Sequence, residues 1–190
     1  MPYCQAPESA TVFTLLAADI DRELLSLLNR PGMPWLDALM GAASNRGVLL
    51  AVAALAAIYL WVKSPHRGVA ALLLALAIGA ADLVSVRLLK PEFDRARPCL
   101  VDPAHVPHPL GCGSGRSFPS AHATDTAAAA AVFAWAAPRL SAVGLAVVLL
   151  VGVSRVYLGV HWPTDVIAGW VLGAAVGTAL IAIARLRYLR

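Results

Sequence analysis

Residues 68–89 read GVAALLLALAIGAADLVSVRLL, an apolar run long enough to cross the hydrocarbon core of a bilayer as one helix. Only Asp82 and Arg87 interrupt it with charge. The whole chain of 190 residues has the same character, since 59% of it is hydrophobic and only 14% is charged. A soluble domain carries about 25% charged residues. The composition therefore excludes a disordered chain and a nucleic-acid binder, and it indicates a polytopic membrane protein.

Four other apolar stretches accompany this run, so the expected fold class is all-α, a polytopic membrane helix bundle of about five transmembrane helices. The predicted spans are residues 35–62, 68–89, 120–137, 140–157 and 164–186. Pro138 separates the third span from the fourth, because a proline ring clashes with the preceding helical turn. Residues 35–190 are expected to form one membrane domain with a long outer loop at residues 90–119.

The first 34 residues differ from this pattern. Between Thr11 and Asn29 apolar residues recur at helical spacing, and Asp19, Asp21 and Arg22 are among the polar residues between them. An amphipathic helix of this kind lies along the membrane interface or packs on the bundle, and the two alternatives remain open. We assign residues 1–34 to an N-terminal amphipathic interfacial segment.

Three glycines recur every four residues in the last predicted span, at Gly169, Gly173 and Gly177. Rows of small residues let two membrane helices approach closely. The pattern predicts helix packing and not chemistry.

The distribution of basic residues predicts the orientation of the chain. One side of the predicted bundle carries only basic charge, at Lys63, Arg67, Arg139, Arg185, Arg187 and Arg190. Because loops rich in Lys and Arg remain in the cytoplasm, the C-terminus is expected there and the loop at residues 90–119 outside. The small size favours a bacterial inner-membrane protein whose outer loop faces the periplasm.

The cysteines agree with that orientation. Cys4, Cys99 and Cys112 all fall on the predicted outer side, where disulfides persist. We favour a bridge between Cys99 and Cys112, which would contribute about 3 kcal/mol by closing the intervening loop. No CxxC pair or clustered histidines accompany them, so no metal site is expected.

Ionisable residues gather at the outer ends of the spans, where they are candidates for function. Lys90, Arg97 and Arg155 supply three cations that suit a phosphate. Ser120 and the backbone N–H groups near Ala121 open the third span, and a helix start favours an anion.

Two histidines complete this cluster with a nucleophile and a proton donor, His161 and His122. Asp165 follows His161 by four residues, so on a helix its carboxylate can reach one ring nitrogen and orient the other. Clamping cations, a positioned nucleophile and an acid are the parts that metal-free phosphoryl transfer requires.

The chain resembles the type 2 phosphatidic-acid phosphatase family, the lipid phosphate phosphatases, in its bacterial membrane branch. Lys90 through Arg97-Pro98 matches the family motif K-x6-R-P, and Ser154-Arg155 through His161 and Asp165 matches S-R-x5-H-x3-D. The sequence Pro119-Ser120-Ala121-His122 departs from P-S-G-H only at Ala121, a small residue that should still let the backbone approach a phosphate.

The resemblance implies a role for each residue in the cluster. His161 would attack phosphorus and become a phosphohistidine, Asp165 would orient it, and His122 would protonate the leaving oxygen and then activate water. The phosphate oxygens would be held by Lys90, Arg97, Ser120, Arg155 and the Ala121 N–H. No metal and no cofactor are implied.

The expected function is that of an integral membrane phosphatase acting on a lipid phosphate or pyrophosphate at the outer leaflet. Undecaprenyl pyrophosphate is favoured, followed by phosphatidylglycerophosphate and phosphatidic acid. The expected partners are this lipid substrate and the membrane lipids, without nucleic acid. Alternatives are a lipid-to-lipid phosphotransferase of the same family, a lipid A phosphatase and, least favoured, a non-catalytic lipid binder or transporter.

Two further arginines lie in the outer loop, Arg95 and Arg116. Each is a weaker candidate for substrate contact, because a solvated loop charge is the commoner case.

Overall fold

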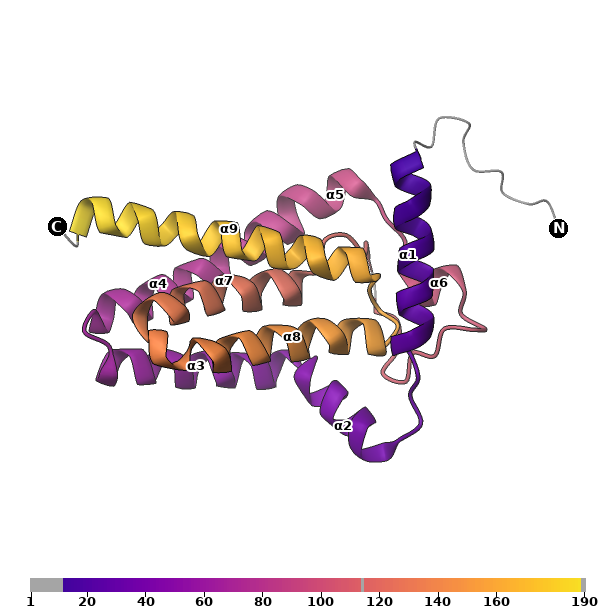
Figure 1. Ribbon diagram of the computed structural model, residues 1–190, viewed down its shortest axis with the longest axis horizontal. Helices are drawn as coiled ribbons and strands as arrows, with labels where there is room; N and C mark the ends of the chain where they lie inside the picture. Colours follow the sequence, from indigo (N-terminus) through magenta and orange to yellow (C-terminus); the bar gives the residue numbers. More distant parts are fainter. Residues whose placement is uncertain (1–11, 114, 189–190) are drawn as a thin grey trace.

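The computed structural model describes residues 12–113 and 115–188, and the regular elements over those residues are all helical (Figure 1). Side chains are described for residues 18–113 and 115–186, so Cys4 and the apolar residues before Ala18 lie outside them. The elements are α1 (Val12–Leu28), α2 (Pro34–Ala43), α3 (Arg46–Lys63), α4 (Arg67–Asp82), η1 (Leu83–Leu89), α5 (Lys90–Phe93), α6 (Pro98–Val101), α7 (Ala121–Ala136), η2 (Pro138–Leu140), α8 (Ser141–Tyr157) and α9 (Pro163–Tyr188).

Four helical stretches of the described chain are long and apolar enough to cross a membrane: Arg46–Lys63, Arg67–Val101, Pro138–Tyr157 and Pro163–Leu186. The third predicted span corresponds to α7, which has 16 residues and packs against α4, α8 and α9. Its alanines explain the central position, because small side chains let three helices approach one axis. The all-helical membrane bundle predicted from composition is confirmed.

The first predicted span, residues 35–62, is wrong at its start. The helix stops after Ala43, and α3 begins again at Arg46 in a different direction (Figure 1). Asn45 separates the two helices as an N-cap, since its side-chain oxygen accepts a hydrogen bond from the Val48 N–H at 3.1 Å. The membrane-crossing part is therefore α3 alone.

The glycine row on α9 packs directly on α7, as predicted. A Cβ atom added at Gly173 would lie 2.0 Å from the carbonyl oxygen of Thr124, and one at Gly169 would lie 2.8 Å from that of Ser120. Only hydrogen fits between the two backbones at these positions. The contact fixes the position of α7 along the axis of α9. It therefore also fixes the relative positions of the residues where the two helices begin.

A change of helical pitch comes at the C-terminal end of α4. The chain continues through η1, a π-helical segment, and the Lys90 N–H donates to the carbonyl of Ser85, five residues earlier. Wider turns of this type change the face on which the following residues project, and they are frequent at functional sites. Asp94 then ends α5 in the left-handed conformation, with φ of 36°, and turns the chain into the outer loop.

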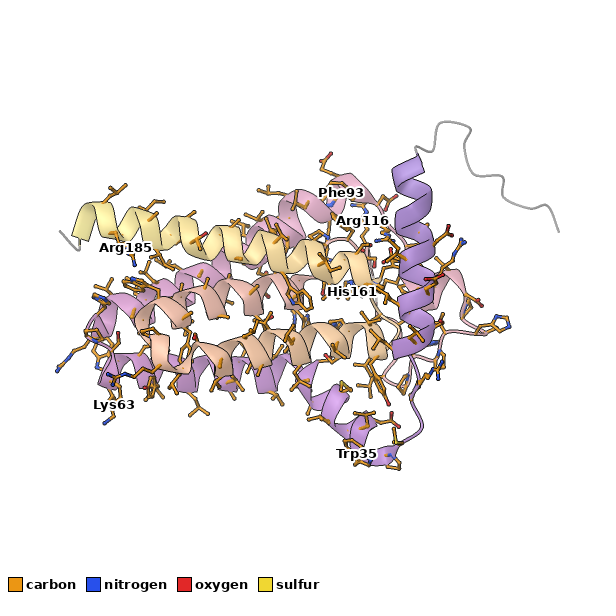
Figure 2. The ribbon with its side chains drawn as sticks, in the orientation of Figure 1. Trp35, Lys63, Phe93, Arg116, His161 and Arg185 are labelled. Carbon is orange, nitrogen blue, oxygen red and sulfur yellow. A yellow bond between two sulfur atoms is a disulfide. The ribbon has the colours of Figure 1, made fainter. Side chains whose placement is uncertain are left out.

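The two ends of the bundle differ in chemistry. Figure 2 shows Lys63 and Arg185 at one end, and His161 and Arg116 toward the other. Helix α1 runs across this second end, beside the outer loop and the start of α9 (Figure 1). Its Leu25 is buried there, whereas Ile20 and Leu27 remain exposed.

We expect Gly173→Ala to lower the free energy of unfolding by about 3 kcal/mol, the upper part of the range for overpacking, because its methyl group would enter the backbone of α7. Thermal unfolding of the detergent-purified protein measures this. Gly79→Ala is the matched control, since nothing lies within 4 Å of a Cβ at that helical position, and it should be neutral or stabilising. Equal melting temperatures for both variants would contradict close packing of α7 and α9.

Candidate active site

His161 lies in the short turn between α8 and α9, and only 3% of its side chain is exposed. Gly159 makes this turn possible. Its φ is +68°, and a Cβ there would lie 2.6 Å from the carbonyl oxygen of Pro107. Pro163 then begins α9, which places Asp165 in the first helical turn facing the imidazole. The His161 Nδ1 atom lies 3.4 Å from Asp165 Oδ2.

The Asp165 carboxylate is fully buried and has four polar partners among the described residues. Oδ2 accepts hydrogen bonds from the Trp162 N–H at 2.9 Å and from the Ser117 hydroxyl, in addition to facing His161. Oδ1 accepts a hydrogen bond from Arg95 Nη1 at 2.6 Å. Each of its oxygens is therefore satisfied, which a buried carboxylate requires.

The other nitrogen of His161, Nε2, lies 3.2 Å from Arg97 Nη1. Because a guanidinium only donates, this contact and the carboxylate at Nδ1 favour the tautomer with hydrogen on Nδ1 and a lone pair on Nε2. Burial lowers the pKa of His161 well below its ordinary value of about 6.5, and the guanidinium groups of Arg155 and Arg97 lower it further. A neutral imidazole with its lone pair beside a cation is a competent nucleophile toward an anion that the cation binds.

Lys90 and Arg97 meet at one segment of the outer loop. Lys90 Nζ donates to the carbonyl oxygens of Arg116 and Ser117, at 2.8 and 3.2 Å, and Arg97 Nη2 lies 3.5 Å from the same Arg116 oxygen. Since the Ser117 hydroxyl donates to Asp165, the loop joins both cations to the His161–Asp165 pair. The two motifs that carry these four residues are thus in contact through residues 116–117.

The second histidine approaches from α7. His122 Nε2 donates to the Ser44 carbonyl at 3.1 Å, and the Ser44 hydroxyl is hydrogen-bonded to that of Ser154 at 2.8 Å, next to Arg155. This arrangement leaves Nδ1 of His122 for proton transfer.

Ser120 and Ala121 lie where α7 begins. The Ser120 N–H donates to the backbone oxygen of Asp165 at 3.0 Å, which holds the start of α7 against α9. The Ser120 hydroxyl and Arg155 Nε are buried without a hydrogen-bond partner in the described part of the chain. Two unpaired buried donors at this level are a reason to expect an acceptor-rich ligand.

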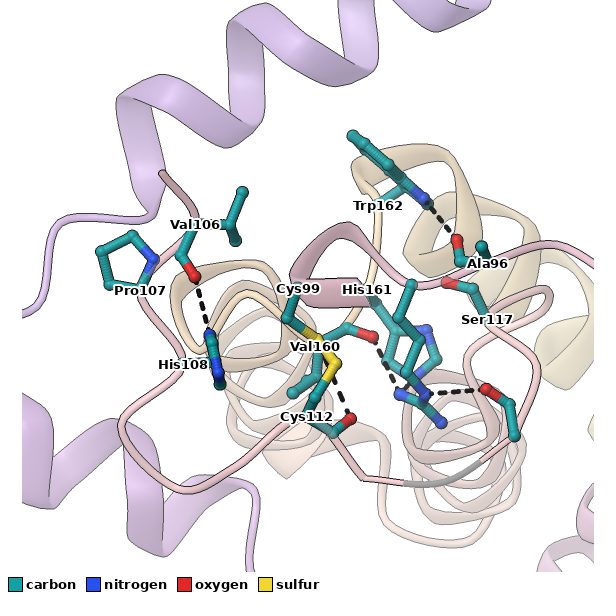
Figure 3. Close-up of a disulfide and its surroundings, with 12 residues drawn as sticks. Ala96, Cys99, Val106, Pro107, His108, Cys112, Ser117, Val160, His161 and Trp162 are labelled. Carbon is teal, nitrogen blue, oxygen red and sulfur yellow. Dashed lines mark hydrogen bonds between the residues drawn. A yellow bond between two sulfur atoms is a disulfide. The ribbon is translucent and has the colours of Figure 1, made fainter. Parts of the chain in front are cut away.

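A cavity of about 330 Å³ opens between α2, the outer loop and the end of α8. Arg97 and Arg155 line it, together with Ser44 and residues 110–113 of the loop. A disulfide joins Cys99 to Cys112 with their Cα atoms 5.7 Å apart, and Figure 3 shows it beside Val160 and His161. Trp162 donates a hydrogen bond from Nε1 to the Ala96 carbonyl at 2.9 Å, which joins the turn after α8 to the loop before Arg97.

A second, larger cavity of about 640 Å³ lies among α3, α4, α7 and α8. His122 and Asp125 line one end of it, and Arg46 lines both this cavity and the smaller one. The rest of its wall is mainly aliphatic and aromatic, from residues such as Leu55 and Phe133. An apolar space that begins at a catalytic-type histidine suits a hydrocarbon chain attached to a polar head.

Arg95 is placed differently from the sequence expectation, which treated it as a solvated loop charge and is wrong. Its guanidinium bridges Asp165 and Asp21, and the same group contacts the Thr164 hydroxyl at 2.8 Å. Arg116, by contrast, forms a partly exposed pair with Asp94 at 2.5 Å. Asp21, Ser117 and Thr164 were not identified from the sequence, because their partners are far away in the chain and no local spacing marks them.

Within the described residues, no group of three or more His, Cys, Asp or Glu side chains is arranged to hold a metal ion. The polar groups of the site are mainly cationic and N–H or O–H donors, together with a histidine that is hydrogen-bonded to a buried carboxylate. The arrangement can hold a phosphate and attack it.

Comparison with known proteins agrees with this chemistry. The family model described as the PAP2 superfamily matches residues 68–188. An undecaprenyl-diphosphatase of Sulfolobus acidocaldarius is 32% identical over 157 residues, which cover 80% of this chain and 72% of that protein. A lipid A 4'-phosphatase of Bacteroides thetaiotaomicron is 29% identical over 178 residues, covering 88% and 78%.

The fold has a counterpart among solved structures. The crystal structure of a transmembrane PAP2-type phosphatidylglycerolphosphate phosphatase from Bacillus subtilis superposes with a TM-score of 0.68 at 28% identity. The match covers 94% of this chain and 95% of that one.

The Cys99–Cys112 disulfide should stabilise the loop that bounds the smaller cavity. We expect the double variant Cys99→Ser/Cys112→Ser to lose about 3 kcal/mol of unfolding free energy, since the closed loop restricts the unfolded chain. Thermal unfolding with and without reductant measures it: reductant should lower the melting temperature of the natural protein and leave the variant unchanged. Free thiols on both cysteines in non-reducing peptide mass spectrometry would contradict the bridge.

Proposed function

The chain belongs to the PAP2 superfamily, and from that premise we propose that it removes the terminal phosphate of a lipid phosphate or pyrophosphate through a phosphohistidine on His161. It is a phosphatase of lipid phosphate esters, as its relatives are named. The observation that carries the proposed mechanism is the position of His161 between two groups, with Asp165 at Nδ1 and Arg97 at Nε2.

In the first step, the lone pair on His161 Nε2 attacks phosphorus and a P–N bond forms as the bond from phosphorus to the lipid oxygen breaks. Asp165 stabilises the imidazolium that develops. His122, in its protonated form, gives the Nδ1 proton to the leaving oxygen. The lipid leaves as an alcohol, or as a monophosphate when the substrate is a pyrophosphate.

In the second step, His122 takes a proton from water and the hydroxide attacks phosphorus. The P–N bond breaks, its electron pair returns to His161 Nε2, and inorganic phosphate is released. Lys90, Arg97, Arg155, the Ser120 hydroxyl and the Ala121 N–H hold the phosphoryl oxygens in both steps. Charge that develops on those oxygens is stabilised by these preorganised donors. Ser120 Oγ and Arg155 Nε have no hydrogen-bond partner among the described residues, which supports their assignment.

The favoured substrate is undecaprenyl pyrophosphate, because the larger cavity is long and apolar and a relative is named for that activity. The hydrocarbon chain enters laterally between helices and lies in this cavity, with its phosphate near His122 and Arg97. Phosphatidylglycerophosphate, phosphatidic acid and lipid A are the competing substrates, since the proposed site binds only the phosphate group that all of these lipids carry. The site lies toward the end of the bundle opposite Lys63 and Arg185, and this separation supports the proposal that it faces the periplasm from a bacterial inner membrane.

Phosphate release by the detergent-purified chain, with EDTA present, tests the mechanism on a panel of these four lipids. His161→Ala should lower kcat by about 10⁴-fold, because the nucleophile is lost, and His122→Ala by about 10²- to 10⁴-fold. His105→Ala is the matched control, since the side chain of this loop histidine is 82% exposed and pairs with Asp102, and the variant should act like the natural protein.

Turnover that survives in His161→Ala would refute the phosphohistidine. Radiolabelled phosphate recovered on a second lipid, without free phosphate, would identify a phosphotransferase. Binding of a lipid phosphate without any turnover in the natural protein would favour a lipid binder.

The position of the hydrocarbon chain is tested by Gly144→Phe, which places a ring in the wall of the larger cavity, where a Cβ itself is tolerated at 3.6 Å from its nearest neighbour. We expect KM for the long-chain lipid to rise about tenfold or more, whereas kcat/KM for a short water-soluble phosphate ester stays unchanged. Leu149→Phe is the control on the exposed side of α8. An unchanged KM for the lipid in Gly144→Phe would place its chain elsewhere.

A further inference from the structure

Asp21 is a buried acid on α1, a helix outside the three motifs. Its side chain is 1% exposed, although its neighbours Ile20 and Arg22 are exposed. Oδ1 accepts a hydrogen bond from the Thr164 N–H at 2.8 Å, and Oδ2 accepts one from the Thr164 hydroxyl at 2.6 Å. Asp21 therefore caps the first turn of α9 from a different helix.

That turn carries Asp165, so the cap acts on the site. The first N–H groups of a helix have no partner within it, and a carboxylate near them is stabilised by the helix dipole. With Thr164 bound at both its backbone and its hydroxyl, the residue immediately before Asp165 is fixed in position.

Arg95 extends the contact to the Asp165 carboxylate itself. Its Nη2 forms an ion pair with Asp21, and its Nη1 donates to Asp165 Oδ1 at 2.6 Å. The guanidinium also lies over the Trp162 ring, 5.4 Å from the ring centre. Because the guanidinium is planar and rigid, anchoring one nitrogen on Asp21 determines where the other meets Asp165.

We infer that Asp21 is a positioning residue for the reaction: through Arg95 and Thr164 it holds Asp165 Oδ1, so that Oδ2 stays directed at His161. The inference rests on the proposed roles of His161 and Asp165. Asp21 touches no reacting atom, and its effect is on the orientation of the nucleophile. The amphipathic segment thereby becomes part of the active site and not only an attachment to the membrane.

The variant Asp21→Asn tests this in the full-length, detergent-purified chain. It keeps the size of the side chain but removes the charge that anchors Arg95. We expect kcat to fall about tenfold or more while KM stays within about twofold, because substrate binding does not involve Asp21. Asp19→Asn is the matched control, since it makes the same charge change at an exposed position of α1 and should leave both constants unchanged.

A second variant tests the hydrogen bonds among Asp21, Arg95 and Thr164 without a change of charge. Thr164→Val removes only the hydroxyl that joins Asp21 and Arg95, and it should lower kcat severalfold with KM unchanged. Thr178→Val is its control on α9, where the hydroxyl bonds only to carbonyls of its own helix. If Asp21→Asn does not fold, Thr164→Val decides, and an unchanged kcat in that variant overturns the inference.

A double-mutant cycle separates positioning from general stability. Because Asp21 acts through Arg95 as well as through Thr164, Asp21→Asn should lower kcat by a smaller factor in the Arg95→Gln background than in the natural chain. Multiplying effects, a raised KM, or a full kcat in Asp21→Asn would overturn the inference. His161→Ala is assayed in the same preparation: its activity would refute the proposed function, whereas an inactive His161→Ala with a normal Asp21→Asn would refute only the positioning role.

Discussion

Burial of the Asp165 carboxylate constrains the whole end of the bundle that carries the loop at residues 90–119. A carboxylate removed from water is costly unless several donors satisfy it, and here the donors come from separate parts of the chain. Ser117 and Arg95 belong to the outer loop, and the Trp162 N–H belongs to the turn between α8 and α9. Loop and turn are therefore held in one arrangement by a single charge. The same arrangement sets His161 against Asp165 on one side and Arg97 on the other.

The packing of the helices fixes the position of α7 along the axis of α9. Because α7 and α9 touch backbone to backbone along the glycine row, neither can slide without a clash. The Ser120 N–H donates a hydrogen bond to the Asp165 carbonyl, which holds the two helices together where they begin. His122, two residues into α7, is thereby held at a constant height relative to His161. The proposed reaction transfers a phosphoryl group to His161 while His122 protonates the leaving oxygen, so it depends on that distance, and geometry errors of about 1 Å reduce rates strongly.

Much of this molecule could be predicted from its sequence because the signals are local. Apolar runs located most of the main helices within a few residues, and the spaced motifs include His161, Asp165 and Arg97, which lie in contact. The break at Asn45 was missed because apolar stretches lie on both sides of Ser44-Asn45-Arg46, and only this short polar cap marks it. Arg95 and Asp21 were missed for another reason. Arg95 lies 70 residues from Asp165, and Asp21 lies 143 residues from Thr164, so their pairing leaves no spacing pattern.

The larger cavity lies among membrane helices and begins at His122. A lipid whose chain occupies it arrives by diffusion within the bilayer, and the water phase never contains the substrate as a free solute. The substrate concentration that governs the rate is then its mole fraction among the surrounding lipids, that is, its amount per area of membrane. Adding inert detergent or lipid dilutes such a substrate even when its total amount per volume is constant. In a cell, the rate would follow the composition of the leaflet around the protein.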